Sequence, residues 1–290
     1  DQLENFLRPD QAIVLARGTL DLGSRTHIMG VLNVTPDSFS DGGRYTDLDH
    51  AVEHSRKMIA AGADVIDIGG ESTRPGAEPL SEDEELRRII PVIERVAAEP
   101  GAIVSVDTYK ANVARKALDA GAAIVNDISG LRFSPEMAKI AGDRGAAVVI
   151  MHIKGTPRDM QREPVYDDVI GEITEYLAEG IELALKGGVR RGRIMIDPGI
   201  GFGKTLEHNL SILERLDEFR CLGCPIVLGT SRKRFIGTVL GLSEPQDRVF
   251  GTAATVSLGI TRGARLLRVH DVQAMTQVAR MTDAILGSKL

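Results

Sequence analysis

The sequence predicts a single α/β domain folded as a (β/α)8 (TIM) barrel. Its 290 residues exceed an ordinary domain and suit this fold, which usually needs about 250 residues. Short apolar runs rich in Val and Ile alternate with longer amphipathic segments, as in a parallel sheet covered by helices. Eight such runs are present, the number that closes a barrel.

The predicted strands are nearly continuous apolar runs, as expected for strands buried on both faces. They are Ile28–Val34, Val65–Gly69, Ile103–Val106, Ile124–Ile128, Ala147–His152, Ile194–Ile196, Pro225–Gly229 and Leu266–Val269. Apolar residues three and four positions apart predict the intervening helices. These are Ala51–Ala61, Glu82–Ala98, Val113–Ala120 and Ile170–Lys186, with two more near Arg248–Arg262 and Val272–Leu286.

The segments outside these elements complete one domain, 1–290, with a barrel core at about 27–287. Asp10–Leu22 precedes the first strand and is predicted to form a hairpin that closes the barrel bottom. Thr35–Asp47 and Ser72–Leu80 are predicted to be long, mobile loops. A glycine precedes three of the strands, at Gly62, Gly121 and Gly145, where it can take the left-handed conformation that ends a helix.

Composition excludes several classes of partner. The net charge is −6, no long basic run occurs, and aromatic residues make up 4% with no Trp, so nucleic acid is not expected as a partner. No apolar stretch approaches the roughly 18 residues of a membrane helix, and no export signal is recognisable, so a cytoplasmic protein is expected. Cys221 and Cys224 are the only cysteines. Their C-x-x-C spacing is interpreted as a turn before a buried strand rather than as a redox or zinc site.

Polar and ionisable side chains lie at or directly after the carboxyl end of every predicted strand. In chain order they are Asn33, Glu71–Arg74, Asp107, Asn126–Asp127, His152, Asp197, Ser231–Lys233 and Arg268–His270. A single acid after a strand is usually a helix cap or a turn residue. Eight such endings are better explained by convergence on the carboxyl-terminal face of a barrel, where active sites lie. The sequence therefore predicts a functional site on that face.

The residue types at this face predict a ligand with two parts. Asp107 and Asp197 could face each other across the barrel mouth and accept hydrogen bonds from adjacent N–H groups of a flat ring. Asn126 can both donate and accept, which suits a heterocycle. The cations are suited to phosphate or pyrophosphate. They are Arg74, Lys233, Arg268 and His270. Alternatively, Lys233 and Arg234 form a solvated helix start.

The glycine-rich segment Asp197–Thr205 follows a strand and resembles a nucleotide-binding loop. The P-loop spacing fails because Pro198 stands at its first glycine position. The dinucleotide pattern fails because Lys204 stands at its third. A tight barrel loop that lets the backbone approach a ligand is the better interpretation.

Seven strings, in order and over nearly the whole chain, resemble the dihydropteroate synthases. They are Leu32–Gly43 (LNVTPDSFSDGG), Asp67–Gly76 (DIGGESTRPG), Ser105–Thr108 (SVDT), Val125–Gly130 (VNDISG), Asp197–Gly203 (DPGIGFG), Ser231–Lys233 (SRK) and Arg268–His270 (RVH). The resemblance implies a (β/α)8 barrel and a transferase of folate biosynthesis. In that reaction p-aminobenzoate displaces pyrophosphate from 6-hydroxymethyl-7,8-dihydropterin pyrophosphate, giving 7,8-dihydropteroate. It also implies a sulfonamide target and a homodimer.

The resemblance also implies a role for each motif residue. The pterin is expected to bind Asp107, Asn126, Met151, Asp197 and Lys233. Pyrophosphate is expected at Asn33, Arg74, Arg268 and His270, with Asn33 acting through a bound Mg2+. The two loops are expected to receive p-aminobenzoate through Asp41, Thr73, Arg74 and Pro75. Some family members carry a Ser that touches the p-aminobenzoate carboxylate at the position of Arg234, which here could pair with that carboxylate or point into solvent.

The chemistry expected of this set is an SN1-like substitution, with Asp107, Lys233 and Arg268 as the catalytic residues. An ionised Asp107 would stabilise the pterin cation, while Mg2+ and Arg268 stabilise the leaving anion. Two alternatives stay open. One is a paralogue that binds pterin without catalysis. The other is a pterin-dependent methyltransferase, which would need neither the Ser72–Pro75 loop nor the Arg268–His270 anion site. Helices near Arg248–Arg262 and Val272–Leu286 carry small and apolar residues that suit a dimer interface.

Overall fold

Eight parallel strands close into a barrel in the computed structural model, which describes residues 12–15, 18–34, 44–72 and 76–287. The strands are β3 (His27–Asn33), β4 (Val65–Gly69), β5 (Val104–Asp107), β6 (Ile124–Asp127), β7 (Ala147–Met151), β8 (Ile194–Asp197), β9 (Ile226–Leu228) and β10 (Ala264–Val269). Each strand pairs with the next along the chain, and β10 pairs with β3 from Leu266↔His27 to Val269↔Gly30. The predicted barrel is confirmed, and the predicted strands coincide with these within two residues at each end.

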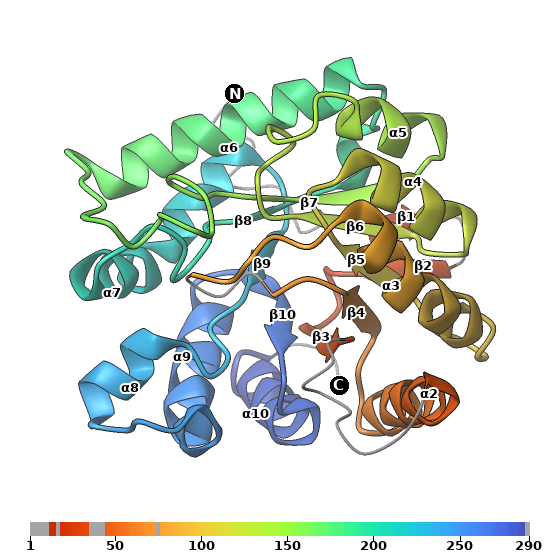
Figure 1. The fold of residues 1–290 in the computed structure, drawn as a ribbon. Coiled ribbons are helices and arrows are strands. Elements are labelled where there is room, and N and C mark those ends of the chain that lie inside the picture. Colours follow the sequence, from red (N-terminus) through yellow and green to blue (C-terminus); the bar gives the residue numbers. More distant parts are fainter. Residues whose placement is uncertain (1–11, 16–17, 35–43, 73–75, 288–290) are drawn as a thin grey trace.

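Helices surround the strands (Figure 1). They are α2 (Arg44–Ala60), α3 (Glu82–Ala97), α4 (Ala111–Asp119), α5 (Met137–Asp143), α6 (Val169–Lys186), α7 (Leu206–Glu214), α8 (Arg234–Leu240), α9 (Val249–Thr261) and α10 (Val272–Ile285), with short 3-10 turns η2 (Arg191–Arg193), η3 (Leu216–Leu222) and η4 (Pro245–Arg248). Their inner faces bury Val, Ile, Leu and Ala side chains against the outside of the barrel. This layer is the main hydrophobic core.

The first helix differs from its prediction. It begins at Arg44, so the last four residues of the predicted loop Thr35–Asp47 are helical. The apolar stripe of this helix starts at Leu48 and continues through Ala51 and Val52, all packed against the core. In the turn before Leu48 only Tyr45 has helical spacing to this stripe, and one such position is too little for periodicity to indicate a helix.

Three short helices lie outside the predicted segments. They are α5, α7 and α8, of seven, nine and seven residues. An apolar period over two turns depends on few positions; it was recognisable in the nine-residue α4, predicted as Val113–Ala120, but not in these three helices. One of them has a local signal instead: Thr205 caps α7 by accepting from the backbone N–H of His208 at 3.3 Å.

The N-terminal segment forms the predicted hairpin. Strands β1 (Ala12–Leu15) and β2 (Gly18–Asp21) pair antiparallel. Its buried side chains, Ile13, Leu15, Leu20 and Leu22, pack against barrel-interior residues near the amino ends of the strands, including Met29. The hairpin therefore closes the bottom of the barrel and leaves the carboxyl-terminal face for the site.

Two smaller predictions are also confirmed. Gly62, Gly121 and Gly145 have φ values of 102°, 116° and 62°, in the left-handed region that ends a helix. Cys221 and Cys224 form no disulfide: Cys221 lies in the last turn of η3, and Cys224 lies between η3 and the buried strand β9. Within the described part of the chain, no helix has the length and apolar character required to cross a bilayer.

Candidate active site

An arginine at the centre of the barrel mouth joins three strands. The Nε of Arg268, on β10, donates to the Oδ2 of Asp67 at 2.6 Å, and its Nη2 donates to the Oδ2 of Asp107 at 2.6 Å. Asp67 lies on β4 and Asp107 ends β5. The arginine side chain is 23% exposed and therefore lies at the boundary between the barrel interior and its open face. The parallel strands bring these three charges together although 201 positions separate Arg268 from Asp67.

Asp67 is a site residue that the sequence interpretation missed. It is fully buried, accepts from Arg268 and also accepts from the Nδ2 of Asn126 at 3.1 Å. Its Oδ1 has no hydrogen-bond partner among the described residues. The signal that could have found it is an acid inside an otherwise apolar strand, since a buried carboxylate requires a partner.

Two carboxyls of this face, Asp107 and Asp197, have raised pKa values. Burial raises the pKa of Asp107 to about 7; Arg268 works against this shift, and the negative charge of Asp67 adds to it. Burial also raises the pKa of Asp197, while the nearby Lys233 lowers it. Titratable groups displaced towards neutral pH and lying in one cleft are typical of an active site.

Lys233 lies on the side of Asp197. It is the N-cap residue of α8, its ammonium donates to the carbonyl of Ile200, and it lies 4.6 Å from the centre of the Phe202 ring. Burial lowers its pKa to about 8, with Asp197 opposing the shift. Of the predicted cations, Arg268 is therefore paired with Asp107, and Lys233 lies near Asp197.

The glycine-rich loop is the tight turn that was predicted. The N–H of Gly199 donates to the Oδ1 of Asp197 at 2.7 Å, and Gly199 has a φ of 70°. A Cβ at Gly199 would lie 1.9 Å from the carbonyl oxygen of His152, so only glycine fits there. Lys204 points inward, with its Nζ 2.8 Å from the Nδ1 of His152 and 2.9 Å from the carbonyl of Phe202. It is therefore a buried support of the loop, unlike the lysine of a phosphate-binding loop.

Two of the predicted pyrophosphate residues, Asn33 and His270, line one cavity of about 540 Å3. The remainder of its lining comes from β3, α2 and the chain after β9: Val31, Leu32, His50, Glu53, His54, Lys57 and Arg232. Ser231 orients His270, because its Oγ lies 3.1 Å from both the backbone N and the Nδ1 of that histidine. Arg268 does not line this cavity and is paired with Asp67 and Asp107 instead.

Comparisons with known proteins agree with this geometry. The family of pterin binding enzymes matches residues 29–270. The dihydropteroate synthase of Synechocystis is 46% identical over 285 residues, which are 98% of each chain. The chain belongs to the dihydropteroate synthase family. The Clostridium difficile dihydropteroate synthase solved with pteroic acid is 49% identical, with a TM-score of 0.88 over 93% of this chain and 100% of that one. The Xanthomonas albilineans dihydropteroate synthase solved with 4-aminobenzoic acid is 44% identical, with a TM-score of 0.90 over 97% and 100%.

Most residues expected from a dihydropteroate synthase can be located on this face. Met151 ends β7 directly beside Asp197, with which it is in register, and is buried. Arg234 is exposed at the first position of α8. The predicted p-aminobenzoate residues Asp41, Thr73, Arg74 and Pro75 lie outside the described residues.

Proposed function

We propose that this dihydropteroate synthase family member performs the family reaction by an SN1-like substitution over the Asp67–Arg268–Asp107 cluster. The single observation that carries the assignment of roles is this cluster, with Asn126 bound to it and Asp197 and Lys233 beside it. It brings carboxylates, an amide and a cation together at the carboxyl ends of the strands, which suits a flat ring with adjacent N–H donors.

The pterin is held by the acids and the amide. Asp107 and Asp197 accept hydrogen bonds from the ring's N–H groups, and Asn126 supplies both a donor and an acceptor. Met151 packs beside the ring, since a thioether adapts well to a flat heterocycle. Lys233 donates to a ring acceptor from its position near Phe202.

Bond cleavage precedes attack in this proposal. The bond between the methylene carbon and the pyrophosphate oxygen breaks, and the electron pair leaves with pyrophosphate. Positive charge then spreads over the methylene and the ring, where the ionised Asp107 stabilises it. The neutral amine of p-aminobenzoate forms the new C–N bond and loses one proton to solvent. A strong general base is not required, because an aniline nitrogen is already unprotonated at neutral pH.

Pyrophosphate is assigned to the cavity beside Asn33 and His270, with Arg268 and Arg74 adding positive charge. Among the described residues no three His, Cys, Asp or Glu side chains are grouped to hold a metal. Mg2+ generally keeps several waters and takes its other oxygens from one or two protein groups and from substrate phosphates. Asn33 is the residue that would hold it here, through its amide oxygen. The ion would supply positive charge that favours departure of the pyrophosphate.

p-Aminobenzoate is assigned to the outer end of the cleft. The proposed contacts are Asp41, Thr73, Arg74 and Pro75 from the two connections predicted as loops, with Arg234 at the start of α8. The exposure of Arg234 supports a contact with a carboxylate at the rim rather than with the buried ring.

We further propose a cytoplasmic homodimer. Its support is two cysteines without a disulfide, as in a reducing compartment, and exposed apolar side chains on α9 and α10.

Release of pyrophosphate from dihydropterin pyrophosphate with Mg2+, measured with and without p-aminobenzoate, tests the reaction. We expect release that rises with p-aminobenzoate and matches dihydropteroate formed. Pterin binding without release would instead indicate a non-catalytic paralogue. Absence of both binding and release would refute the assignment altogether.

Asp107→Asn tests the role of the carboxylate. Asn keeps an acceptor for the pterin but no negative charge for the cation, and Arg268 stays paired with Asp67. We expect kcat to fall about 100-fold or more, while the Kd for the pterin, measured by calorimetry, rises less than about tenfold. Equal losses in kcat and affinity would show that Asp107 only binds the ring.

A further inference from the structure

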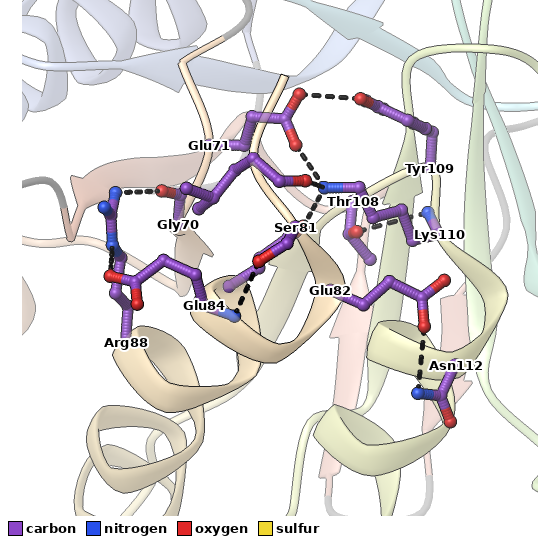
Figure 2. A network of polar contacts seen from close by, with 12 residues as sticks. Gly70, Glu71, Ser81, Glu82, Glu84, Arg88, Thr108, Tyr109, Lys110 and Asn112 are labelled. Atoms are coloured by element: carbon purple, nitrogen blue, oxygen red, sulfur yellow. Dashed lines mark hydrogen bonds and ion pairs between the residues drawn. The ribbon is translucent and has the colours of Figure 1, made fainter. Parts of the chain in front are cut away.

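One ammonium group joins both ends of the connection between β4 and α3. The Nζ of Lys110 donates to the carboxylate of Glu71, to the carbonyl of Leu80 at 2.7 Å and to the Oε2 of Glu85 at 2.6 Å. Glu71 comes two residues after β4 ends, and Leu80 comes two residues before α3 begins. Figure 2 shows Lys110 reaching across to Glu71 from the start of α4.

The ammonium of Lys110 is largely buried, and it has one acceptor for each of its three N–H groups. The side chains of Lys110, Glu71 and Glu85 are only 12%, 9% and 1% exposed. Three acceptors match the three N–H donors of an ammonium. Burial raises the pKa of Glu85, and Lys110 opposes that shift. A surface ion pair contributes little, but removing one member of a buried set leaves uncompensated charge.

The two ends are also held by neighbouring groups. The hydroxyl of Tyr109 donates to the Oε1 of Glu71 at 2.6 Å. Arg88, itself bound to Glu84 at 2.8 Å, donates to the carbonyl of Gly70 at 3.2 Å. Ser81, which follows Leu80, is the N-cap of α3. These contacts are drawn in Figure 2, where Lys110 is the group that contacts both sides of the connection.

The strands do not need this arrangement, because the β4–β5 ladder is complete from Ile66↔Val104 to Gly69↔Asp107. The contacts of Lys110 instead join a residue that follows β4 to the residues that precede and begin α3. Lys110 also comes three residues after Asp107, the last residue of β5 and a carboxylate assigned to the pterin. The same ammonium therefore links Glu71 and Leu80 to the end of the strand that carries Asp107. Thr108 ties this stretch together by accepting from the backbone N–H of Lys110 at 3.2 Å.

We propose that Lys110 is a positioning residue for p-aminobenzoate. It holds Glu71 and Leu80 at a set distance, and through them it fixes where the chain leaves β4 and where it enters α3. This inference rests on the proposed function, which assigns part of p-aminobenzoate recognition to this connection. In this proposal Lys110 acts through Glu71 and Leu80 rather than by contact with a substrate, and the groups assigned to the pterin on β5, β6 and β8 are held by their own strands.

Lys110→Met is the main test, because Met has similar length and no charge. We expect the KM for p-aminobenzoate to rise about tenfold or more, since small misplacement of a binding group has large kinetic effects. The Kd for the pterin, measured by calorimetry, should change less than about threefold, a smaller effect than the loss of one hydrogen bond. Lys110→Arg keeps a cation with several donors and should recover most of the p-aminobenzoate KM.

Two further variants keep the test decisive. Glu71→Gln loosens one end of the connection while Lys110 still binds Glu85, and it should raise the p-aminobenzoate KM in the same direction if Lys110→Met does not fold. Arg144→Met removes an exposed ion pair with Asp119 at the other end of α4 and should leave both constants unchanged. An unchanged p-aminobenzoate KM in a folded Lys110→Met, or an equal loss in both substrates, would overturn the proposal. Failure of the proposed function would instead appear in the unmodified protein, where the rate of pyrophosphate release would not depend on p-aminobenzoate.

Discussion

At the scale of single residues, the site depends on charges that are costly to bury. Asp67 and Asp107 share one guanidinium, and the raised pKa of Asp107 shows that Arg268 does not fully compensate its burial. A buried charge without full compensation is unfavourable for folding, but it is favourable for binding a donor-rich ring or a cation. The Oδ1 of Asp67, which no described residue contacts, is a further acceptor of this kind.

These shifts predict a bell-shaped dependence of kcat/KM on pH. Asp107 must be ionised, and its pKa is raised to about 7, so activity should be lost as pH falls through that value. Lys233 must be protonated, and its pKa is lowered to about 8, so activity should be lost as pH rises through that value. Steady-state rates with the dihydropterin pyrophosphate substrate measure both limbs.

Two variants separate these limbs from titration of the substrate itself. Asp67→Asn removes a negative charge that raises the pKa of Asp107, so the acid limb should move to lower pH. Lys233→Arg replaces the lysine with a group that stays protonated, so the alkaline limb should move to higher pH. Limbs that stay in place in both variants would belong to the substrate and would contradict the assignment.

At the scale of elements, the long amphipathic helices were predictable, and of the helices of seven to nine residues only α4 was predicted, as Val113–Ala120. The predicted segments Glu82–Ala98 and Ile170–Lys186 agree with α3 and α6 within one residue at each end. Helix α5 has only seven residues, and its place is determined by packing on α6. A Cβ at Gly142 of α5 would lie 2.1 Å from the carbonyl oxygen of Gly187, the C-cap of α6. The position of α5 is therefore determined by its close packing against α6, which is a tertiary contact.

Gly142→Ala should consequently lower the free energy of unfolding by about 1–3 kcal/mol, because the added methyl group forces the two helices apart. Urea denaturation measures the change. Gly192→Ala is the matched control, since a Cβ there meets nothing within 4 Å, and its effect should stay within about 0.5 kcal/mol. If the Gly142→Ala variant were as stable as the Gly192→Ala variant, the prediction would be wrong, because α5 and α6 could then move apart without a loss in the free energy of unfolding.

At the scale of the whole molecule, the hairpin at one end and the charges at the other give the barrel two different faces. The apolar plug buries Ile13 and Leu20 at the amino ends of the strands, while the carboxyl ends hold the ionisable cluster. A third region, on α9 and α10, exposes large apolar side chains. Phe250, Met281 and Ile285 are 83%, 63% and 72% exposed. Such exposure is typical of a contact surface.

The homodimer predicts a sedimenting species of twice the 31.2 kDa chain mass at micromolar concentration. Phe250→Glu and Ile285→Glu place charge on the apolar surface and should shift the equilibrium towards the monomer, because a charge at an interface loses its water. Val165→Glu changes an equally exposed apolar residue on another part of the surface, at 69%, and should leave the mass unchanged. A monomer in the unmodified protein would refute the dimer.

The barrel, its plugged bottom and the face that carries the chemistry were predictable from the amino-acid sequence alone. Apolar runs and helical periods are local properties, and parallel strands necessarily bring their carboxyl ends to one edge. The motifs further predict that Asp107, Asn126 and Asp197 bind one ligand.

The pairing of the charges, in contrast, depends on the tertiary structure. Arg268 binds Asp67 and Asp107 instead of lining the cavity of Asn33 and His270, and Lys110 bridges Glu71 and Leu80. These contacts join residues far apart in the chain and depend on side-chain length and burial, which no local pattern encodes.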